Sequence, residues 1–366
     1  MSIVAKSSKE IGSYFSIDPT LICGDVENET NLFDNAQYLS TCRSAIKLIL
    51  SQIDKNNKVA LLPAFTCHAV VEPFISSGFQ VAPYTINRDL TIDLDNLKSL
   101  VDTENPSVIL FHDYFGFDTN SSLKKSGLIE YIQSKEIVIV DDQTQSMFSS
   151  YTHTNADYYI GSIRKWMGIP DGAFLQGNIE IPCITEDKEL SKAKSKAMVY
   201  KHKYLTQNQG NKDTLLSLYK EAETILDLRL NAYIMSNLSK NLISKYDISS
   251  FCKARQNNAR ILLNYIEKCE YIRFVNNSPS DDEVPFYIPI FVEKNRAKFQ
   301  KYLAKNGVFA TVIWGCPQEY EGHISQDSQS IYNEILCVPC DQRYNEDDMK
   351  YIGQLMLDFK QEINNE

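Results

Sequence analysis

Residues 107–142, SVILFHDYFGFDTNSSLKKSGLIEYIQSKEIVIVDD, carry the clearest sign of the architecture. Two short apolar runs, 107–116 and 136–142, flank the segment 123–135, whose apolar residues have helical spacing. Runs that are apolar throughout are typical of strands in a parallel sheet covered by helices on both faces. Ligands of such sheets bind beyond the carboxyl ends of the strands, so the polar residues after each run are the candidates for chemistry.

The alternation extends to both sides of this stretch. The patterns predict helices at 44–53 and 69–79, strands at 59–64 and 80–86, and a mainly helical, highly charged region over 186–270. Strands return from 271 onward, in YIRFV, FYIPIFV, VFATVIW and EILCVPC, with helices at 295–305 and 346–362. The sequence therefore predicts an α/β chain with a smaller α+β C-terminal domain.

The composition excludes several classes of protein. With 366 residues we expect one large domain and a smaller one, and the net charge of −10 argues against a nucleic-acid partner. No apolar run approaches the roughly 20 residues of a membrane span, and the N-terminus lacks a signal-peptide core. Nine scattered cysteines favour reduced thiols, hence a cytoplasmic location. Cys337 and Cys340 form a C-x-x-C pair without a second ligand pair, so no metal site is predicted.

Two residues at strand ends stand out as candidates. Asp142 closes the run 137–142, where it would reach the ligand crevice; the alternative is a helix N-cap or turn residue. Lys165 follows another strand-like stretch and has Ile163 and Trp166 nearby. A lysine in an apolar setting can serve as a Schiff-base residue, whereas the alternative is an ordinary solvated charge.

The segment LSTCRSAIKLIL (39–50) offers small polar residues at a helix start, where backbone N–H groups and the helix dipole attract anions. A plain N-cap by Ser40 or Thr41 explains the same residues. Together the three signals describe a site for pyridoxal 5′-phosphate (PLP). The helix start at 43–45 would hold the phosphate, Lys165 would bond the aldehyde, and Asp142 would keep the pyridine nitrogen protonated.

Several stretches resemble the DegT/StrS family of PLP-dependent sugar aminotransferases. TCRSAI (41–46) is similar to its phosphate helix, VIVDDQTQS (138–146) to its Glu-Asp-x-x-Gln motif and GSIRK (161–165) to its serine-to-lysine segment. The resemblance implies fold type I: a large domain with a mostly parallel seven-stranded sheet between helices, plus a small α+β C-terminal domain. It also implies an N-terminal arm at 1–35 packing on the small domain, a large PLP-binding domain at 36–240 and a small domain at 241–366.

The resemblance also assigns residues. Catalysis would fall to Lys165 and Asp142, and cofactor binding to those two together with Gln145 on the ring hydroxyl, Ser162 on the phosphate, Cys42, Arg43 and Ser44 in the phosphate helix, and His68. His68 is a candidate because the aromatic residue that stacks on the ring is replaced by Cys67; a core or surface role is the alternative.

The chain also departs from the family pattern. The lysine follows the serine two residues sooner than usual, Cys42 replaces a glycine, and Ala232-Tyr-Ile-Met lacks the asparagine and arginine by which a partner chain contacts the phosphate. Asn231 and Tyr233 are weak candidates for that role.

The implied activity is transfer of an amino group from an amino acid, typically glutamate, to a keto group of a nucleotide-linked sugar, in a homodimer with active sites at the subunit interface. Two alternatives remain: a PLP-dependent lyase or dehydratase, and a PLP-free binding subunit. Arg343 is a candidate for a substrate carboxylate or sugar, and the lysines at 188–203 for a diphosphate, although a solvated helix face explains those lysines better. Trp314 is expected to pack rather than bind.

Overall fold

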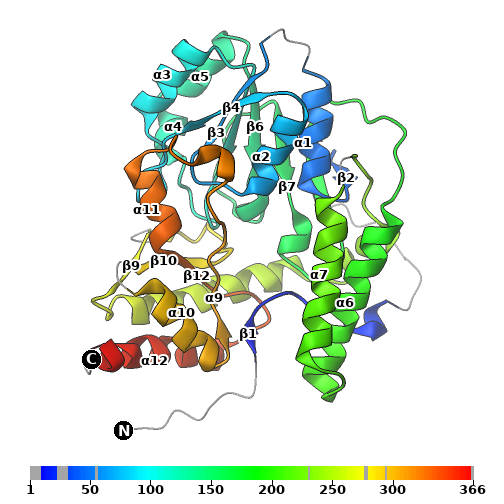
Figure 1. Ribbon diagram of the computed structural model, residues 1–366, viewed down its shortest axis with the longest axis vertical. Helices are drawn as coiled ribbons and strands as arrows, with labels where there is room; N and C mark the ends of the chain where they lie inside the picture. Colours follow the sequence, from blue (N-terminus) through cyan, green and yellow to red (C-terminus); the bar gives the residue numbers. More distant parts are fainter. Residues whose placement is uncertain are drawn as a thin grey trace.

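A seven-stranded sheet forms the centre of the larger part of the molecule (Figure 1). The computed structural model describes residues 10–22, 32–53, 57–229, 231–275, 279–292 and 295–363. The sheet has the order β2-β8-β7-β6-β5-β3-β4, in which β8 runs antiparallel to both neighbours and the other pairs are parallel. This confirms the predicted mostly parallel sheet. Its strands are β2 (Gln37–Leu39), β3 (Val59–Pro63), β4 (Gln80–Tyr84), β5 (Val108–His112), β6 (Val138–Asp142), β7 (Tyr158–Gly161) and β8 (Ala173–Gly177).

Helices cover both faces of this sheet because its strands are apolar on both sides. Alternate residues of β5, such as Ile109 and Leu110, belong to two separate buried clusters. The helices α1 (Cys42–Ser51) and α2 (His68–Ser76) pack on one face, and α3 (Leu94–Glu104), α4 (Ser121–Lys125) and α5 (Leu128–Ser134) on the other. The helix predicted at 123–135 is therefore two helices. It breaks at Gly127, whose φ of 76° lies in the left-handed region that glycine tolerates.

The charged region after β8 is helical but interrupted. Two long helices, α6 (Lys188–Gln207) and α7 (Lys212–Asp227), lie side by side, and α8 (Asn237–Ile243) and α9 (Ile248–Ile266) follow (Figure 1). Between α7 and α8 the chain is extended, because the Met235 N–H donates to the Tyr38 carbonyl at 3.1 Å and Ile234 pairs with Leu39. The apolar spacing of this segment is helical, yet it borders the large sheet.

The C-terminal part is a small α+β layer, as predicted. A three-stranded antiparallel sheet, β12-β10-β9, joins β9 (Ile272–Phe274), β10 (Ile288–Val292) and β12 (Ile335–Val338). The helices α10 (Arg296–Lys305), α11 (Gln326–Glu334) and α12 (Glu346–Ile363) accompany it. The strand expected at 308–314 is only β11 (Val308–Phe309).

The N-terminal segment pairs with this C-terminal layer. The short strand β1 (Ile11–Gly12) lies parallel to β11, and the Gly12 N–H donates to the Tyr344 hydroxyl at 2.6 Å. Other residues of the arm contact the large part, since the Ile17 N–H donates to the Met198 carbonyl of α6 at 3.3 Å, and the predicted packing of the arm and the boundaries at 35 and 240 remain predictions. Residues 1–9 and 23–31 of the arm lie outside the described residues.

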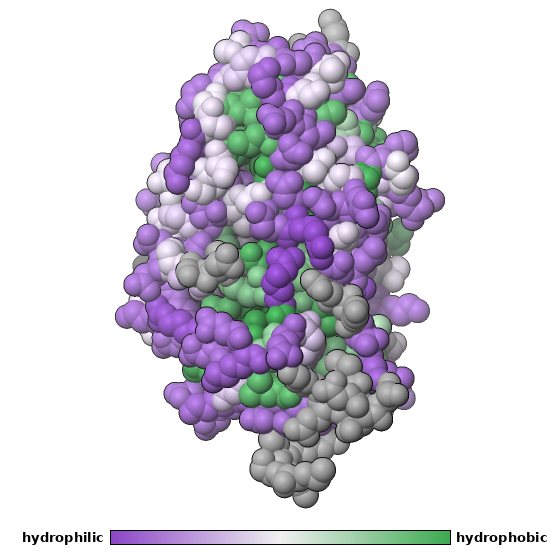
Figure 2. All heavy atoms as spheres, turned by 90° about the vertical axis from the view of Figure 1, so that its left-hand side faces the viewer, coloured by the Kyte–Doolittle hydropathy of each residue, from purple (hydrophilic) through white to green (hydrophobic). Residues whose placement is uncertain are grey.

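The molecular surface is mostly hydrophilic on the face shown in Figure 2, where hydrophobic residues gather at mid-height. No helix within the described residues is long and apolar enough to cross a membrane. Cys337 and Cys340 are fully buried core residues, and among the described residues no group of three or more His, Cys, Asp or Glu side chains could hold a metal ion.

Candidate active site

Three segments that the sequence singled out meet at Thr144. This residue lies in the 3-10 helix η2 (Gln143–Gln145), directly after β6. Its hydroxyl accepts the Ser162 N–H at 3.1 Å and lies 3.5 Å from the Cys42 sulfur, and its carbonyl accepts the indole N–H of Trp166 at 2.7 Å. The start of α1, the end of β6 and the turn after β7 are thereby joined at one sheet edge. Thr144 was not assigned a role from sequence, although it lies inside the quoted motif 138–146.

Asp142 occupies the buried end of β6 and has two neighbours. Its Oδ1 accepts the Thr144 N–H at 2.9 Å, so it also caps η2, as the alternative interpretation proposed. Its Oδ2 lies 3.6 Å from Nδ1 of His112, which ends β5 and pairs with Asp142 in register. On its other side the His112 ring lies 2.7 Å from the Thr66 hydroxyl. Burial lowers the pKa of His112, so the imidazole is neutral at neutral pH.

Lys165 closes the 3-10 helix η3 (Ile163–Lys165) and lies half-buried at the wall of a cavity. Its position relative to Asp142 follows from their shared neighbours. Burial raises the pKa of the Cys42 thiol to about 12; the Asp142 charge adds to this rise and the Lys165 charge opposes it. Both charges also act on the pKa of His112. The charges of Asp142 and Lys165, which belong to two different elements, therefore both act on Cys42 and His112.

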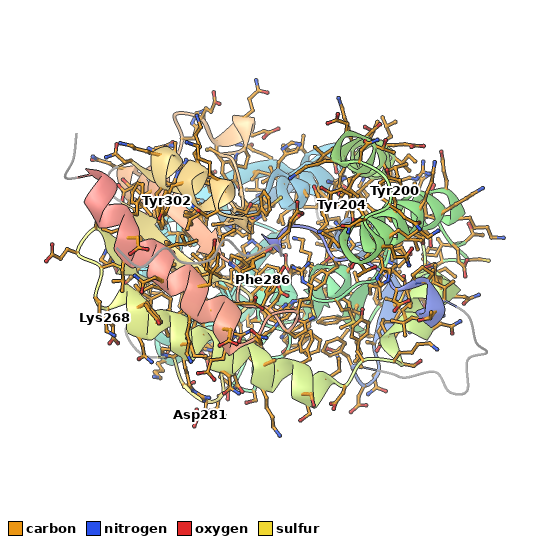
Figure 3. The ribbon with its side chains drawn as sticks, turned by 90° about the horizontal axis from the view of Figure 1, so that it is seen from below. Tyr200, Tyr204, Lys268, Asp281, Phe286 and Tyr302 are labelled. Carbon is orange, nitrogen blue, oxygen red and sulfur yellow. The ribbon has the colours of Figure 1, made fainter. Side chains whose placement is uncertain are left out.

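The cavity beside Lys165 measures about 620 Å³ and is lined by parts of the chain that are distant in sequence. Figure 3 shows Phe286, one of its lining residues, near the middle of the molecule between the C-terminal helices and α6, which carries Tyr200 and Tyr204. Trp314 lines the cavity and also packs on Phe65 at 4.9 Å between ring centroids. The described lining residues are Ser13, Tyr14, Phe15, Cys67, Arg164, Lys165, Ile169, Pro170, Lys194, Met198, Tyr219, Glu223, Phe286, Tyr287, Phe309, Ala310, Thr311, Ile313 and Trp314.

The start of α1 offers backbone donors rather than side chains to an anion. Thr41 is the N-cap, and its hydroxyl accepts the Ser44 N–H at 3.2 Å. The Ser44 hydroxyl accepts the Tyr233 N–H at 3.3 Å, and Arg43 turns toward α7, where it donates to the Leu226 carbonyl and pairs with Asp227 at 3.0 Å. The first N–H groups of a helix have no intrahelical partner. The N–H groups at the start of α1 are therefore the groups that suit a phosphate, with Ser162 close by.

Gln145 lies buried beside Asp142. Its Oε1 accepts the Phe115 N–H at 2.7 Å, which fixes the amide so that its NH₂ end is the remaining donor. A glycine follows Phe115: Gly116 has a φ of 91°, and a Cβ there would lie 2.0 Å from the Val284 carbonyl oxygen. The close contact between this turn and the C-terminal part requires glycine.

Of the predicted site residues only Lys165 lines the cavity, and two of the others are held by partners elsewhere. His68 is 59% exposed at the start of α2, with Nδ1 3.5 Å from the Glu319 carboxylate, so its ring does not line the cavity and the surface alternative describes it. Arg343 is paired with Asp341 at 2.7 Å, donates to the carbonyls of Ser13 and Tyr14, and lies over the Phe15 ring. The Arg343 side chain therefore holds the N-terminal arm rather than a substrate. His68 and Arg343 lie in the segments that the resemblance indicated, but their contacts with Glu319 and Asp341 direct the side chains away from the cavity.

The residues that do meet fit PLP by their chemistry. An amine for the aldehyde, a buried carboxylate for the pyridine nitrogen, an amide NH₂ for the ring hydroxyl and free helix N–H groups for the phosphate are present in Lys165, Asp142, Gln145 and α1. The fit lacks one feature, because Cys67 stands where an aromatic ring would stack.

No protein-family model and no curated protein matches the sequence. Solved structures do match. The aminotransferase TlmJ from Streptoalloteichus hindustanus superposes with a TM-score of 0.64 at 13% identity, over 88% of this chain and 84% of that one. The aminotransferase PseC from Helicobacter pylori, involved in the biosynthesis of pseudoaminic acid, gives 0.63 at 15% identity over 88% and 85%.

This chain has the fold of those aminotransferases. The same fold occurs in a dehydratase from Escherichia coli, GDP-4-keto-6-deoxy-D-mannose-3-dehydratase with bound hydrated PLP, which gives a TM-score of 0.61 at 15% identity over 88% of this chain and 87% of that one. The similarity confirms the predicted PLP-dependent transferase fold type I. At such identities it establishes the fold alone, and the chemistry rests on the residues of this chain.

Proposed function

We propose that this chain is a PLP-dependent aminotransferase of the DegT/StrS type. The observation that carries the proposal is the set of hydrogen bonds at Thr144, which join Asp142 to Ser162 and to Trp166, the neighbour of Lys165, while Lys165 itself lines the cavity. Solved structures with this fold include sugar aminotransferases, one of them in its PMP form and a relative with bound hydrated PLP.

The chain's own residues have distinct tasks in this proposal. When bound, PLP would supply an electron-accepting ring that stabilises negative charge at the α-carbon of an amino acid. Asp142 would hold a proton at the pyridine nitrogen, and Gln145 would donate to the ring hydroxyl. Lys165 would bond the aldehyde carbon and, once released by the amino donor, would move a proton at the α-carbon through its Nζ as general base and acid.

The proposed substrates are an amino-acid donor, typically glutamate, and a nucleotide-linked keto sugar. The cavity of about 620 Å³ is large enough for a sugar and is lined by both charged and aromatic residues. We further propose a cytoplasmic homodimer in which the partner chain completes the phosphate site, because the start of α1 offers no free side-chain cation: Arg43 is already paired with Asp227.

The test is the site of covalent attachment. Full-length protein incubated with PLP is reduced with borohydride and its peptides are mass-mapped, with the expectation that the cofactor is found on Lys165. Lys194 is the matched control, because it lies in the same cavity and burial lowers its pKa to about 8, which also favours imine formation. Attachment to Lys194, or attachment that persists in Lys165→Ala, contradicts the proposal.

Two further outcomes separate the alternatives. Amino transfer from glutamate to a panel of keto-sugar nucleotides, followed by mass spectrometry, supports the aminotransferase, whereas loss of a hydroxyl without nitrogen gain indicates a dehydratase. A protein that binds no PLP and stays colourless at saturating cofactor is a binding subunit with this fold.

A further inference from the structure

Arg164 presents its guanidinium group to the cavity. It precedes Lys165 in η3 and lines the same cavity. Its Nε is buried and has no hydrogen-bond partner, and within the described residues its guanidinium forms no salt bridge. Since a buried polar group without a partner is costly, a ligand that accepts from this Nε gains more than it would from a fully exposed arginine.

A second cation lies opposite, on α6. Lys194 is only 5% exposed and pairs with Glu223 of α7. Burial lowers the pKa of Lys194 to about 8, and the Arg164 charge is the next cause of that shift, so the two cations lie close together. Arg164 also acts on the pKa of Tyr14, whose ring stacks on Tyr219 at 4.3 Å. The unpaired guanidinium therefore faces α6, α7 and the N-terminal arm.

The charges around the cavity do not balance. Its described lining residues include the three cations Arg164, Lys165 and Lys194 but a single carboxylate, Glu223. Glu223 is held by Lys194, so the lining residues leave no carboxylate for Arg164, which is adjacent to Lys165 in the chain. A cavity of this kind attracts anions and favours an acidic ligand group placed beside the reactive amine.

We propose that Arg164, supported by Lys194, forms the oxyanion subsite of this cavity and binds a carboxylate or phosphate group of the substrate next to Lys165. The planar guanidinium donates two parallel hydrogen bonds to either oxyanion, which lysine cannot do. The inference rests on the proposed function for the identity of the ligand, since the carboxylate of an amino-acid donor and the diphosphate of a nucleotide-linked acceptor share this chemistry.

Binding measured without turnover tests the subsite. Calorimetric titration of the full-length, PLP-loaded protein with glutarate and, separately, with inorganic pyrophosphate gives a dissociation constant for each source of the oxyanion. Arg164→Gln is expected to weaken the preferred probe about 10- to 100-fold, because charge-assisted hydrogen bonds contribute on the order of 1.5–3 kcal/mol. Arg164→Lys should recover part of this loss. Lys192→Gln, an exposed lysine of the same helix as Lys194, should change nothing.

The outcomes are separable from those of the cofactor test. Weaker glutarate binding points to the amino donor, weaker pyrophosphate binding to the acceptor, and either supports the subsite. Unchanged binding of both probes in Arg164→Gln overturns it. So does a variant that loses affinity for PLP but not for pyridoxal, since Arg164 would then hold the cofactor phosphate. If PLP does not attach to Lys165, the proposed function fails, while titration of the cofactor-free protein still decides whether the oxyanion subsite exists.

Discussion

The Nδ1 atom of His112 lies 3.6 Å from Oδ2 of Asp142, and the two side chains close neighbouring parallel strands. This separation is too long for a direct hydrogen bond, so the contact is electrostatic. Burial also lowers the pKa of His112, so the imidazole is neutral at neutral pH. Asp141, the preceding residue of β6, has its side chain on the opposite face, as successive strand residues do.

Replacement of Asp142 by asparagine tests whether its charge is used. We expect Asp142→Asn to bind PLP at Lys165 but to transfer amino groups about 100- to 1,000-fold more slowly, because the neutral amide cannot hold the pyridinium proton. Asp141→Asn is the matched control, because Asp141 is equally buried in β6 but points to the opposite face, and burial raises its pKa well above the usual range. Steady-state rates with glutamate measure both. Equal losses in the two variants would mean that the effect is structural.

The Thr144 hydroxyl is expected to support the whole sheet edge. Thr144→Val leaves the buried N–H of Ser162 without its acceptor, which should cost about 1–3 kcal/mol of unfolding free energy. Urea unfolding measures this loss. Thr144→Ser keeps the hydroxyl and should restore most of the stability. If valine is tolerated as well as serine, Thr144 does not join the segments as we describe.

Arg343 is expected to stabilise the protein rather than to bind substrate. Arg343→Ala leaves the buried Asp341 carboxylate without its partner and releases two carbonyls of the arm, so we expect a loss of about 3 kcal/mol in urea unfolding. Arg260→Ala breaks an exposed pair with Asp281 and should cost less than about 1 kcal/mol. A raised KM with unchanged stability would instead return Arg343 to the substrate site.

The same variant has a pH signature. Arg343 holds the pKa of Asp341 below its usual value, although burial opposes this. A depressed carboxyl pKa contributes stability above about pH 4, and that contribution is lost as the pH falls through the folded-state value. The stability difference between wild type and Arg343→Ala should therefore shrink in acid. A difference that is constant with pH would show that the charge of Asp341 is not involved.

Ionisation of Asp113 is expected to lower the free energy of unfolding as the pH rises. Burial raises its pKa to about 7, against 3.8 for the free side chain. Between these values the folded chain holds a proton that the unfolded chain has lost, so stability falls as the pH rises through this window and levels off above it. Asp113→Asn removes this ionisation and should gain stability over wild type from about pH 4 to about pH 7. Urea midpoints across this range measure the gain, with the exposed Glu267→Gln expected to follow wild type.

Much of the fold follows from local pattern, because strands buried on both faces must be apolar throughout. β5 and β6 were expected within two residues of where they begin and end, apart from the early end of β5 at His112. Glycine and strand-edge effects were harder to predict. The break at Gly127 depends on a backbone angle, and the extended chain at 233–235 depends on its contacts with β2, which hydrophobic spacing does not encode.

The site was predictable where residues lie at strand ends and not where side chains cross between elements. The order of Asp142, Ser162 and Lys165 along the chain fixes their common edge, since parallel strands bring their carboxyl ends together. His68 and Arg343 lie in the segments that the resemblance indicated, but the directions of their side chains are set by contacts with Glu319 and Asp341. Arg164 of η3 and Lys194 of α6 line the same cavity, and the sequence indicated this only through a lysine-rich helix, a pattern typical of a solvated helix face.

The N-terminal arm forms part of the cavity wall, and this has a consequence for the synthesis of the chain. Tyr14 lines the cavity, and its carbonyl is held by Arg343, 329 positions further along the sequence. A growing chain therefore presents Lys165 without this part of the cavity wall until Arg343 has been made. Reactivity of this lysine toward aldehydes is tied to complete folding, because contacts of such long sequence separation form late. Chains truncated before Arg343 should contain Lys165 but should lack its reactivity toward aldehydes.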